Sequence, residues 1–196
     1  MRLRPYRKHE DDARLLELAE LIAVRGNPLG LSMLDYKLFE RQLLAEQLMD
    51  ERKQDDDSII VAVADSAEEL QRIVPPQSSP EPAGSANPPR TKPNPSRVQG
   101  QSSRIIGFIN LSVRPDPTSG RPCGYISQLC VDQRFQGEGI GKSLLTEAKQ
   151  WANRNGLFKL TVNLSAANES AISFCEKLGL RLSAVSMEVS CAQPDC

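Results

Sequence analysis

Residues 124–145 read GYISQLCVDQRFQGEGIGKSLL and join an apolar run, a glycine-rich turn and the start of a helical pattern. The run 124–131 has the apolar character of a largely buried strand. The turn 136–141 carries three glycines, which let the backbone bend sharply and bring its N–H groups close to an anion. The helix that follows would add the positive end of its dipole. The stretch therefore predicts a strand, a diphosphate-binding turn and a helix in succession.

The turn differs from two common nucleotide-binding motifs. The P-loop spacing G-x-x-x-x-G-K-[ST] is absent. The run 124–131 is not followed by G-x-G-x-x-G, and no acidic residue stands at the offset expected for a ribose contact. The sequence thus favours a diphosphate cradle that belongs to neither class.

Outward from this segment, hydrophobic periodicity indicates alternating strands and helices. The order is β-α-α-β-(linker)-β-β-α-β-α-β. Strand–helix–strand crossovers in the C-terminal half imply parallel pairing, and the hairpin before them is antiparallel. We expect an α/β (α+β) fold with a mixed sheet and helices on both faces. The expected strands cover residues 3–7, 58–64, 104–113, 124–131, 158–164 and 182–189. The expected helices begin at 11, 31, 140 and 168, with Asn168 as the N-cap of the last one. Gly26, Gly156 and Gly179 mark the ends of the first, third and fourth, and the second runs to about Arg52.

Two of these helices have an apolar face that can be assigned from spacing. In the helix at 31–52 the recurring residues are Leu34, Leu38, Phe39, Leu43 and Leu48. In the helix at 140–156 the face consists of Ile140, Leu144, Leu145, Ala148, Trp151 and Ala152.

Residues 66–103 have a different composition from the rest of the chain. Eight of the 14 prolines fall between Pro75 and Pro95, and large apolar residues are sparse. Such a segment buries too little apolar surface to offset the entropy of ordering it. We expect a disordered Pro/Ser-rich insertion in one domain spanning residues 1–196. It is either a tolerated surface insertion or a segment that binds a partner.

Charge and composition exclude several classes of protein. The chain has 24 Lys and Arg against 25 Asp and Glu, so we expect no attraction to nucleic acid or to an anionic membrane. No apolar run approaches the ~18 residues of a membrane span. His9 is the one histidine, which argues against a metal site. Five cysteines without a C-x-x-C pair, and no secretory leader, favour a cytoplasmic location with reduced thiols.

Two motifs in register resemble the GNAT superfamily of N-acetyltransferases. Q-x-x-G-x-G at Gln136–Gly141 resembles the acetyl-CoA signature of the superfamily. The segment NESAISFCEKLGL at Asn168–Leu180 is similar to its second conserved segment, N-x-x-A-x-x-F-Y-x-K-x-G-F. The resemblance implies a mostly antiparallel sheet that splays at the cofactor site. It also implies acetyl-CoA as co-substrate, and direct attack of a primary amine on the thioester in a ternary complex.

The resemblance also assigns roles to residues. The backbone of Leu129 and Val131 would bind the pantetheine arm, and one of their N–H groups would stabilise the oxyanion. Asn168 would contact the cofactor near its thiol end. The pyrophosphate would be held by the turn and the start of the helix, namely Gln136, Gly137, Glu138, Gly139, Ile140, Gly141, Lys142 and Ser143.

The proton-transfer groups of the superfamily are not matched. Where the second motif has a tyrosine that protonates the leaving thiolate, this chain has Cys175. The strand before the signature carries no glutamate, and Asn163 stands where some members have a histidine. Tyr125 and Cys175 are the candidate catalytic residues, with water as the alternative at both steps and a packing role as the alternative for both side chains.

The acceptor is expected to be an amine of a peptide or of a small molecule. The segment NESAI at 168–172 resembles the protein N-terminal and ribosomal-protein acetyltransferase branch, which favours a protein N-terminal or lysine amine. Two other functions remain open: a small-molecule amine acetyltransferase, and a catalytically weak domain that binds acyl-CoA as a regulator. The chain could act as a monomer or a homodimer.

Overall fold

The computed structural model describes residues 1–22, 33–49, 58–66, 68–69 and 104–187. Their strands form one five-stranded sheet in the order β1-β2-β3-β4-β5. The first three pairings are antiparallel and the pairing of β4 with β5 is parallel. This confirms the expected mixed, mostly antiparallel sheet. The strands are β1 (Arg2–Pro5), β2 (Ile59–Val63), β3 (Ile105–Pro115), β4 (Pro122–Val131) and β5 (Leu160–Val162).

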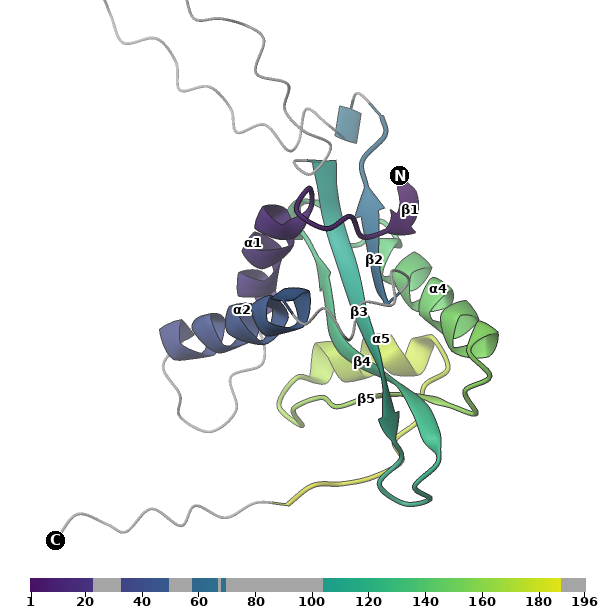
Figure 1. Cartoon of the computed structure of the whole chain (residues 1–196). Coiled ribbons are helices and arrows are strands. Elements are labelled where there is room, and N and C mark those ends of the chain that lie inside the picture. The colour runs from purple at the N-terminus through teal and green to yellow at the C-terminus, as the bar shows by residue number, and fades with distance from the viewer. Residues whose placement is uncertain (23–32, 50–57, 67, 70–103, 188–196) are drawn as a thin grey trace, which may run out of the picture.

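Helices cover both faces of the sheet, as expected (Figure 1). The helices α1 (Asp12–Ile22) and α2 (Met33–Met49) pack on one face, in a core with Leu15, Leu44 and Phe108. The helix α4 (Ile140–Arg154) packs on the other face, against Ile109 and Ile126. The six apolar residues predicted for the inner face of α4 are all buried. The short 3-10 helix η2 (Gln133–Phe135) links β4 to the turn before α4.

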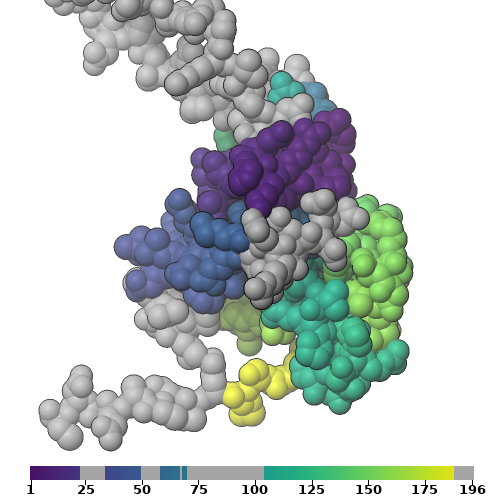
Figure 2. Space-filling model, in the orientation of Figure 1, coloured from purple at the N-terminus to yellow at the C-terminus, as the bar shows by residue number. Residues whose placement is uncertain are grey.

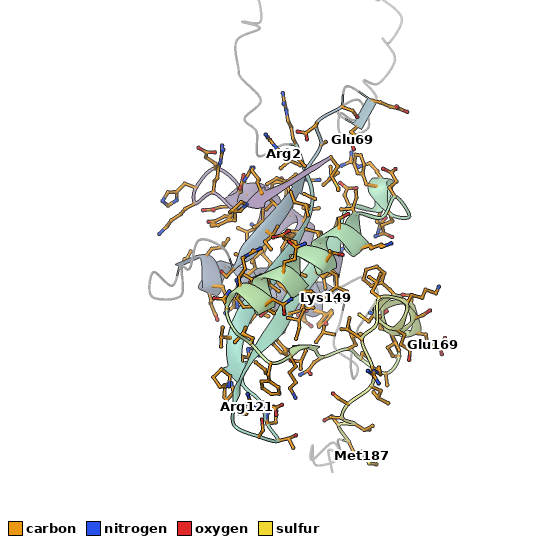
Figure 3. The ribbon with its side chains drawn as sticks, turned by 90° about the vertical axis from the view of Figure 1, so that its right-hand side faces the viewer. Arg2, Glu69, Arg121, Lys149, Glu169 and Met187 are labelled. Atoms are coloured by element: carbon orange, nitrogen blue, oxygen red, sulfur yellow. The ribbon has the colours of Figure 1, made fainter. Side chains whose placement is uncertain are left out.

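The helix α5 (Glu169–Lys177) lies beside α4 (Figure 3). The ammonium of Lys149 on α4 donates a hydrogen bond to the carbonyl oxygen of Leu178, just past the end of α5. A Cβ at Gly141 would lie 3.0 Å from the ring of Phe174, so the absence of a side chain there permits close contact between the two helices. The ring of Phe174 on α5 therefore lies close to the first turn of α4.

The strands β4 and β5 separate along their length. β5 pairs only with residues 124–126 of β4, whereas β3 pairs with β4 as far as Val131. Among the described residues, no strand covers the outer edge of β4 at 127–131. The sheet therefore splays where the sequence resemblance placed the cofactor.

Some sequence expectations differ from the structure. Residues 181–187 form no strand, and the side chains of Leu182, Val185 and Met187 are exposed; 188 and 189 lie outside the described residues. The three-residue strand β5 offers few backbone partners for a further strand. Phe158 and Leu164, expected in the preceding strand, lie outside it and are partly exposed.

The buried face of α2 also differs from the prediction. Leu34, Leu38 and Phe39 are exposed, whereas Glu40 and Leu44 face inward with Leu48. The predicted insertion at 66–103 lies outside the described residues except for 66, 68 and 69. The turn of the β3–β4 hairpin lies at the surface (Figure 2). Within the described ranges, no helix is both long and apolar enough to span a membrane.

Candidate active site

A cavity of about 1100 Å³ lies where β4 and β5 separate. Its wall combines β4, the glycine-rich turn, the first turn of α4, the segment after β5, and the helices α5 and α2. The structure thus brings together residues that are far apart in the sequence. The predicted site residues that line it are Leu129, Val131, Gln136, Gly137, Gly139, Ile140, Gly141, Lys142, Asn168 and Cys175.

The glycine-rich turn depends on two left-handed residues. Gly137 has φ of +86° and Gly139 has φ of +81°, conformations that are costly for residues with a side chain. A Cβ added at either position would meet no atom within 4 Å. Backbone conformation, rather than crowding within the chain, therefore requires glycine here, and the space above the turn is open to a ligand.

The first turn of α4 presents N–H groups to this space. Gly139 is the N-cap and provides no side chain to accept from them. The first intrahelical bond runs from the Ser143 N–H to the Gly139 carbonyl oxygen, over 3.0 Å, so the N–H groups before it have no acceptor within the helix. Lys142 is the one basic side chain among the described residues that line the cavity. This end of the cavity favours an anion.

Two predicted residues near the turn do not line the cavity. The hydroxyl of Ser143 donates to the Gly139 carbonyl oxygen at 3.2 Å and so stays on its own helix. Glu138 is exposed and lies outside the cavity wall. Its carboxylate is therefore not placed against an anion in the turn.

The outer edge of β4 offers backbone groups to the cavity. The Asp132 N–H donates to the Ile106 carbonyl oxygen, so the backbone of Asp132 faces β3. Because backbone groups alternate sides along a strand, those of Leu129 and Val131 face away from β3. One of these groups is occupied: the Val131 carbonyl oxygen accepts from the side-chain amide of Gln136 at 3.0 Å. The remaining groups can pair with an extended ligand lying along this edge.

The helix α5 contributes Asn168 and Cys175. The side-chain oxygen of Asn168 accepts from the Ala171 N–H at 3.2 Å and caps the helix, as predicted from the sequence. Cys175 is 9% exposed, and burial raises the pKa of its thiol. The thiol is thus protonated at neutral pH and is a weaker acid than an ordinary cysteine.

Tyr125 lies apart from the cavity wall. It is opposite Ser112 in β3 and Thr161 in β5, in the part of β4 that is paired on both sides. The guanidinium carbon of Arg114 lies 3.9 Å from the centre of its ring. This cation–π contact gives Tyr125 a packing role in the hairpin.

Sequence reasoning missed a polar cluster on the α2 side of the cavity. Glu40 is 8% exposed, Gln128 is 3% exposed, and both line the cavity with Tyr36. The Gln128 amide nitrogen donates to a Glu40 carboxylate oxygen at 2.8 Å and to the Glu40 carbonyl oxygen at 3.0 Å. Burial, together with the charge of Glu40 and a hydrogen bond to it, raises the pKa of Tyr36 to about 12. The one pattern in the sequence that could have indicated this cluster is the i, i+4 spacing of Tyr36 and Glu40, which places both on one face of a helix.

Comparisons with known proteins bear on this site. A glucosamine 6-phosphate N-acetyltransferase of Trypanosoma brucei brucei is 32% identical over 110 residues, which cover 55% of this chain and 73% of the relative. A mycothiol acetyltransferase of Saccharomonospora viridis is 31% identical over 85 residues, 42% of this chain. The chain spans only 28% of that second relative.

Solved structures show the same fold. A Pyrococcus furiosus protein thought to be an acetyltransferase superposes with a TM-score of 0.62 at 18% identity, over 96% of this chain and 99% of its own. An acetyltransferase of Trypanosoma brucei gives 0.52 at 23% identity, over 96% and 98%. The sequence model of the Acetyltransferase (GNAT) family matches residues 64–180, more than half of the chain. The chain therefore belongs to the GNAT family and is an acetyl-CoA-dependent N-acetyltransferase.

Proposed function

We propose that this protein transfers an acetyl group from acetyl-CoA to a primary amine of a small molecule, with amino sugars as the first class to test. The two relatives described above bear names of small-molecule acetyltransferases, and one is named for glucosamine 6-phosphate. The cavity, at about 1100 Å³, exceeds the roughly 300–1,000 Å³ of ordinary ligand pockets. That size supports simultaneous binding of two substrates.

The observation that carries the proposal is the position of the unpaired edge of β4 beside the N-terminus of α4. In the proposal, the N–H groups of 137–142 and the ammonium of Lys142 bind the pyrophosphate of acetyl-CoA. The free backbone groups of Leu129 and the Val131 N–H bind the pantetheine arm, and Asn168 lies near its thiol end. Because Gln136 occupies the Val131 carbonyl oxygen, this side chain has to turn away if the arm is to pair with both groups.

The backbone N–H groups on the open edge of β4 can assist the acetyl-transfer step. A backbone N–H of Leu129 or Val131 would donate to the thioester oxygen, where negative charge develops as the amine attacks. Residues on the two sides of β4 alternate: Leu129 and Val131 pack with the core beneath α4, whereas Cys130 packs with the core beneath α1 and α2. The cavity reaches both sides, so the thioester and the amine can approach the edge of β4 from different directions.

A peptide amine is the second candidate acceptor. The resemblance of NESAI at 168–172 to the protein N-terminal acetyltransferase branch favours it. Steady-state release of CoA would be measured with glucosamine 6-phosphate, glucosamine and peptides with free N-termini. A kcat/KM at least tenfold higher for a sugar supports the proposal. A tenfold preference for a peptide contradicts it and selects the second candidate. Binding of acetyl-CoA without turnover of any acceptor would instead indicate the regulatory module.

A further inference from the structure

The wall of the cavity holds a carboxylate that forms no ion pair with any of the described residues. Glu40 is 8% exposed and accepts hydrogen bonds from Gln128 and Tyr36. Within the described ranges, no Lys, Arg or His forms an ion pair with Glu40. A buried carboxylate without a cation is unfavourable, because hydrogen bonds replace only part of the hydration that the charge loses.

The adjacent amide adds a second unsatisfied acceptor. Both partners of the Gln128 amide nitrogen are oxygen acceptors on Glu40, which fixes the orientation of the amide. Its other atom, Oε1, is buried and has no hydrogen-bond partner among the described residues. Buried polar atoms in native proteins are rarely left in this state, and one in the wall of a cavity points to a ligand.

Two basic side chains, Arg14 and Lys142, can be considered as partners for this carboxylate, and neither forms an ion pair with it. Arg14 and Glu40 are both close enough to Cys130 for their charges to shift the pKa of its thiol, as is Asp132. However, the Arg14 guanidinium is bound to Asp132 at 2.7 Å and to Glu17 at 2.9 Å. Lys142 lies in the first turn of α4. Along β4, Gln128 precedes Val131 by about 10 Å, at roughly 3.3 Å per residue, so the cluster is well separated from the turn.

We propose that Glu40 binds the ammonium form of the acceptor amine and takes the proton that the amine must lose, with Gln128 Oε1 as the second acceptor. This rests on the proposed acetyl transfer. One proton passes from the ammonium to the Glu40 carboxylate and then to solvent. The freed nitrogen lone pair forms the N–C bond, and the C–S bond breaks with its electron pair going to sulfur. A second proton leaves the nitrogen and ends on that sulfur, which gives the amide and CoA.

The position of Glu40 suits this role. Gln128, which it contacts, is the residue directly before Leu129, whose backbone faces the open edge of β4. An ammonium between Glu40 and Gln128 Oε1 would therefore lie next to the proposed place of the thioester. A cation at this point would also neutralise the buried carboxylate, so one contact supplies both binding and proton removal.

Thermal unfolding without acceptor separates this role from a structural one. In E40Q the new side chain still offers an oxygen to Gln128 and Tyr36, but the buried charge is gone. We expect E40Q to melt about 2–4 °C above the wild type. The matched control is E46Q, which changes an exposed glutamate on the same helix and should leave Tm unchanged. An E40Q protein that melts below E46Q would overturn the proposal, because Glu40 would then stabilise the fold.

Activity and cofactor binding give the second test. With the best amine of the acceptor panel, we expect E40Q to lose about 100-fold in kcat/KM, the size of a lost general base. The Kd for acetyl-CoA should stay within about twofold of the wild type, as in E46Q. A kcat/KM within threefold of E46Q would overturn the role of Glu40 while leaving acetyl transfer intact. If the wild type acetylates no amine, the proposed function fails and the proton-accepting role of Glu40 fails with it, whatever the melting comparison shows.

Discussion

The side-chain amide nitrogen of Gln128 lies 2.8 Å from a carboxylate oxygen of Glu40, although the two residues are 88 positions apart in the chain. This bond joins α2 to β4 just beyond the last residue of β4 that pairs with β5. The N-terminal helices thus complete a cavity whose other walls come from the C-terminal half. The cavity therefore depends on contact between two parts of the chain that lie far apart in the sequence.

Substitution of Gly139 tests whether the glycine-rich turn binds acetyl-CoA. G139A and G120A both place a side chain at positive φ, +81° and +68°, and each should destabilise the fold by about 1–2 kcal/mol. Only G139A puts a methyl group over the proposed pyrophosphate site, so we expect its acetyl-CoA Kd to rise about tenfold or more. Calorimetric titration of both variants measures this. Equal acetyl-CoA affinity in G139A and G120A would show that the turn does not hold the cofactor.

Cys175 tests the identity of the general acid. Burial raises the pKa of this thiol, which makes it a poor proton donor to the CoA thiolate. We expect C175A to keep kcat within about threefold of the wild type and to lose roughly 1 kcal/mol of stability through lost packing. Saturating kinetics and chemical denaturation measure the two effects. A fall in kcat of tenfold or more would restore Cys175 as the acid.

Tyr125 tests the identity of the general base. Its ring stacks against Arg114 and lies outside the cavity wall. Y125F keeps the ring and removes only the hydroxyl, so kcat and its pH dependence should match those of the wild type. If the wild-type pH–rate profile shows the ionisation of a general base and Y125F loses that ionisation, this placement is wrong and Tyr125 is the general base.

We expect the Asp132 carboxylate to contribute to the stability of the folded protein in a pH-dependent way. Burial acts to raise the pKa of this carboxyl, but hydrogen bonds from Arg134 and the charges of Arg134 and Arg14 outweigh it and hold the pKa below its usual range. A carboxyl with a lowered folded pKa stabilises the protein above its unfolded pKa of about 3.9, and this is lost as pH falls through the folded value.

The corresponding measurement compares D132N with the wild type. We expect D132N to melt lower at pH 7, and the difference in Tm to shrink as the pH falls below about 4. Calorimetric scans at a series of pH values would show this. A difference that stays constant down to pH 3 would mean that ionisation of Asp132 contributes nothing.

The sequence predicted those parts of the molecule whose signal is local. The inner face of α4 follows a clean 3.6-residue period, and its six members are all buried. The turn at 136–141 and the cap at Asn168 are read from neighbouring residues, and the structure places both at the cavity.

The Glu40–Gln128 cluster was hidden for two reasons. The buried face of α2 combines Glu40 with Leu44 and Leu48, so a polar residue interrupts its apolar periodicity. The exposed Leu34 and Leu38 repeat at helical spacing and indicate the wrong face as buried. The partner of Glu40 lies on a strand 88 residues away, a distance that no local pattern reports. The final strand at 182–189 was predicted from apolar content alone, without evidence of a strand to pair with it.

The most direct test of the account is mass spectrometry of the products formed by the full chain with acetyl-CoA and the amine panel. We expect one acetyl group to appear on an acceptor amine with the wild type and G120A, and much less with G139A. Absence of an acetylated amine from every reaction, while acetyl-CoA still binds and raises the melting temperature, would contradict acetyl transfer at this site.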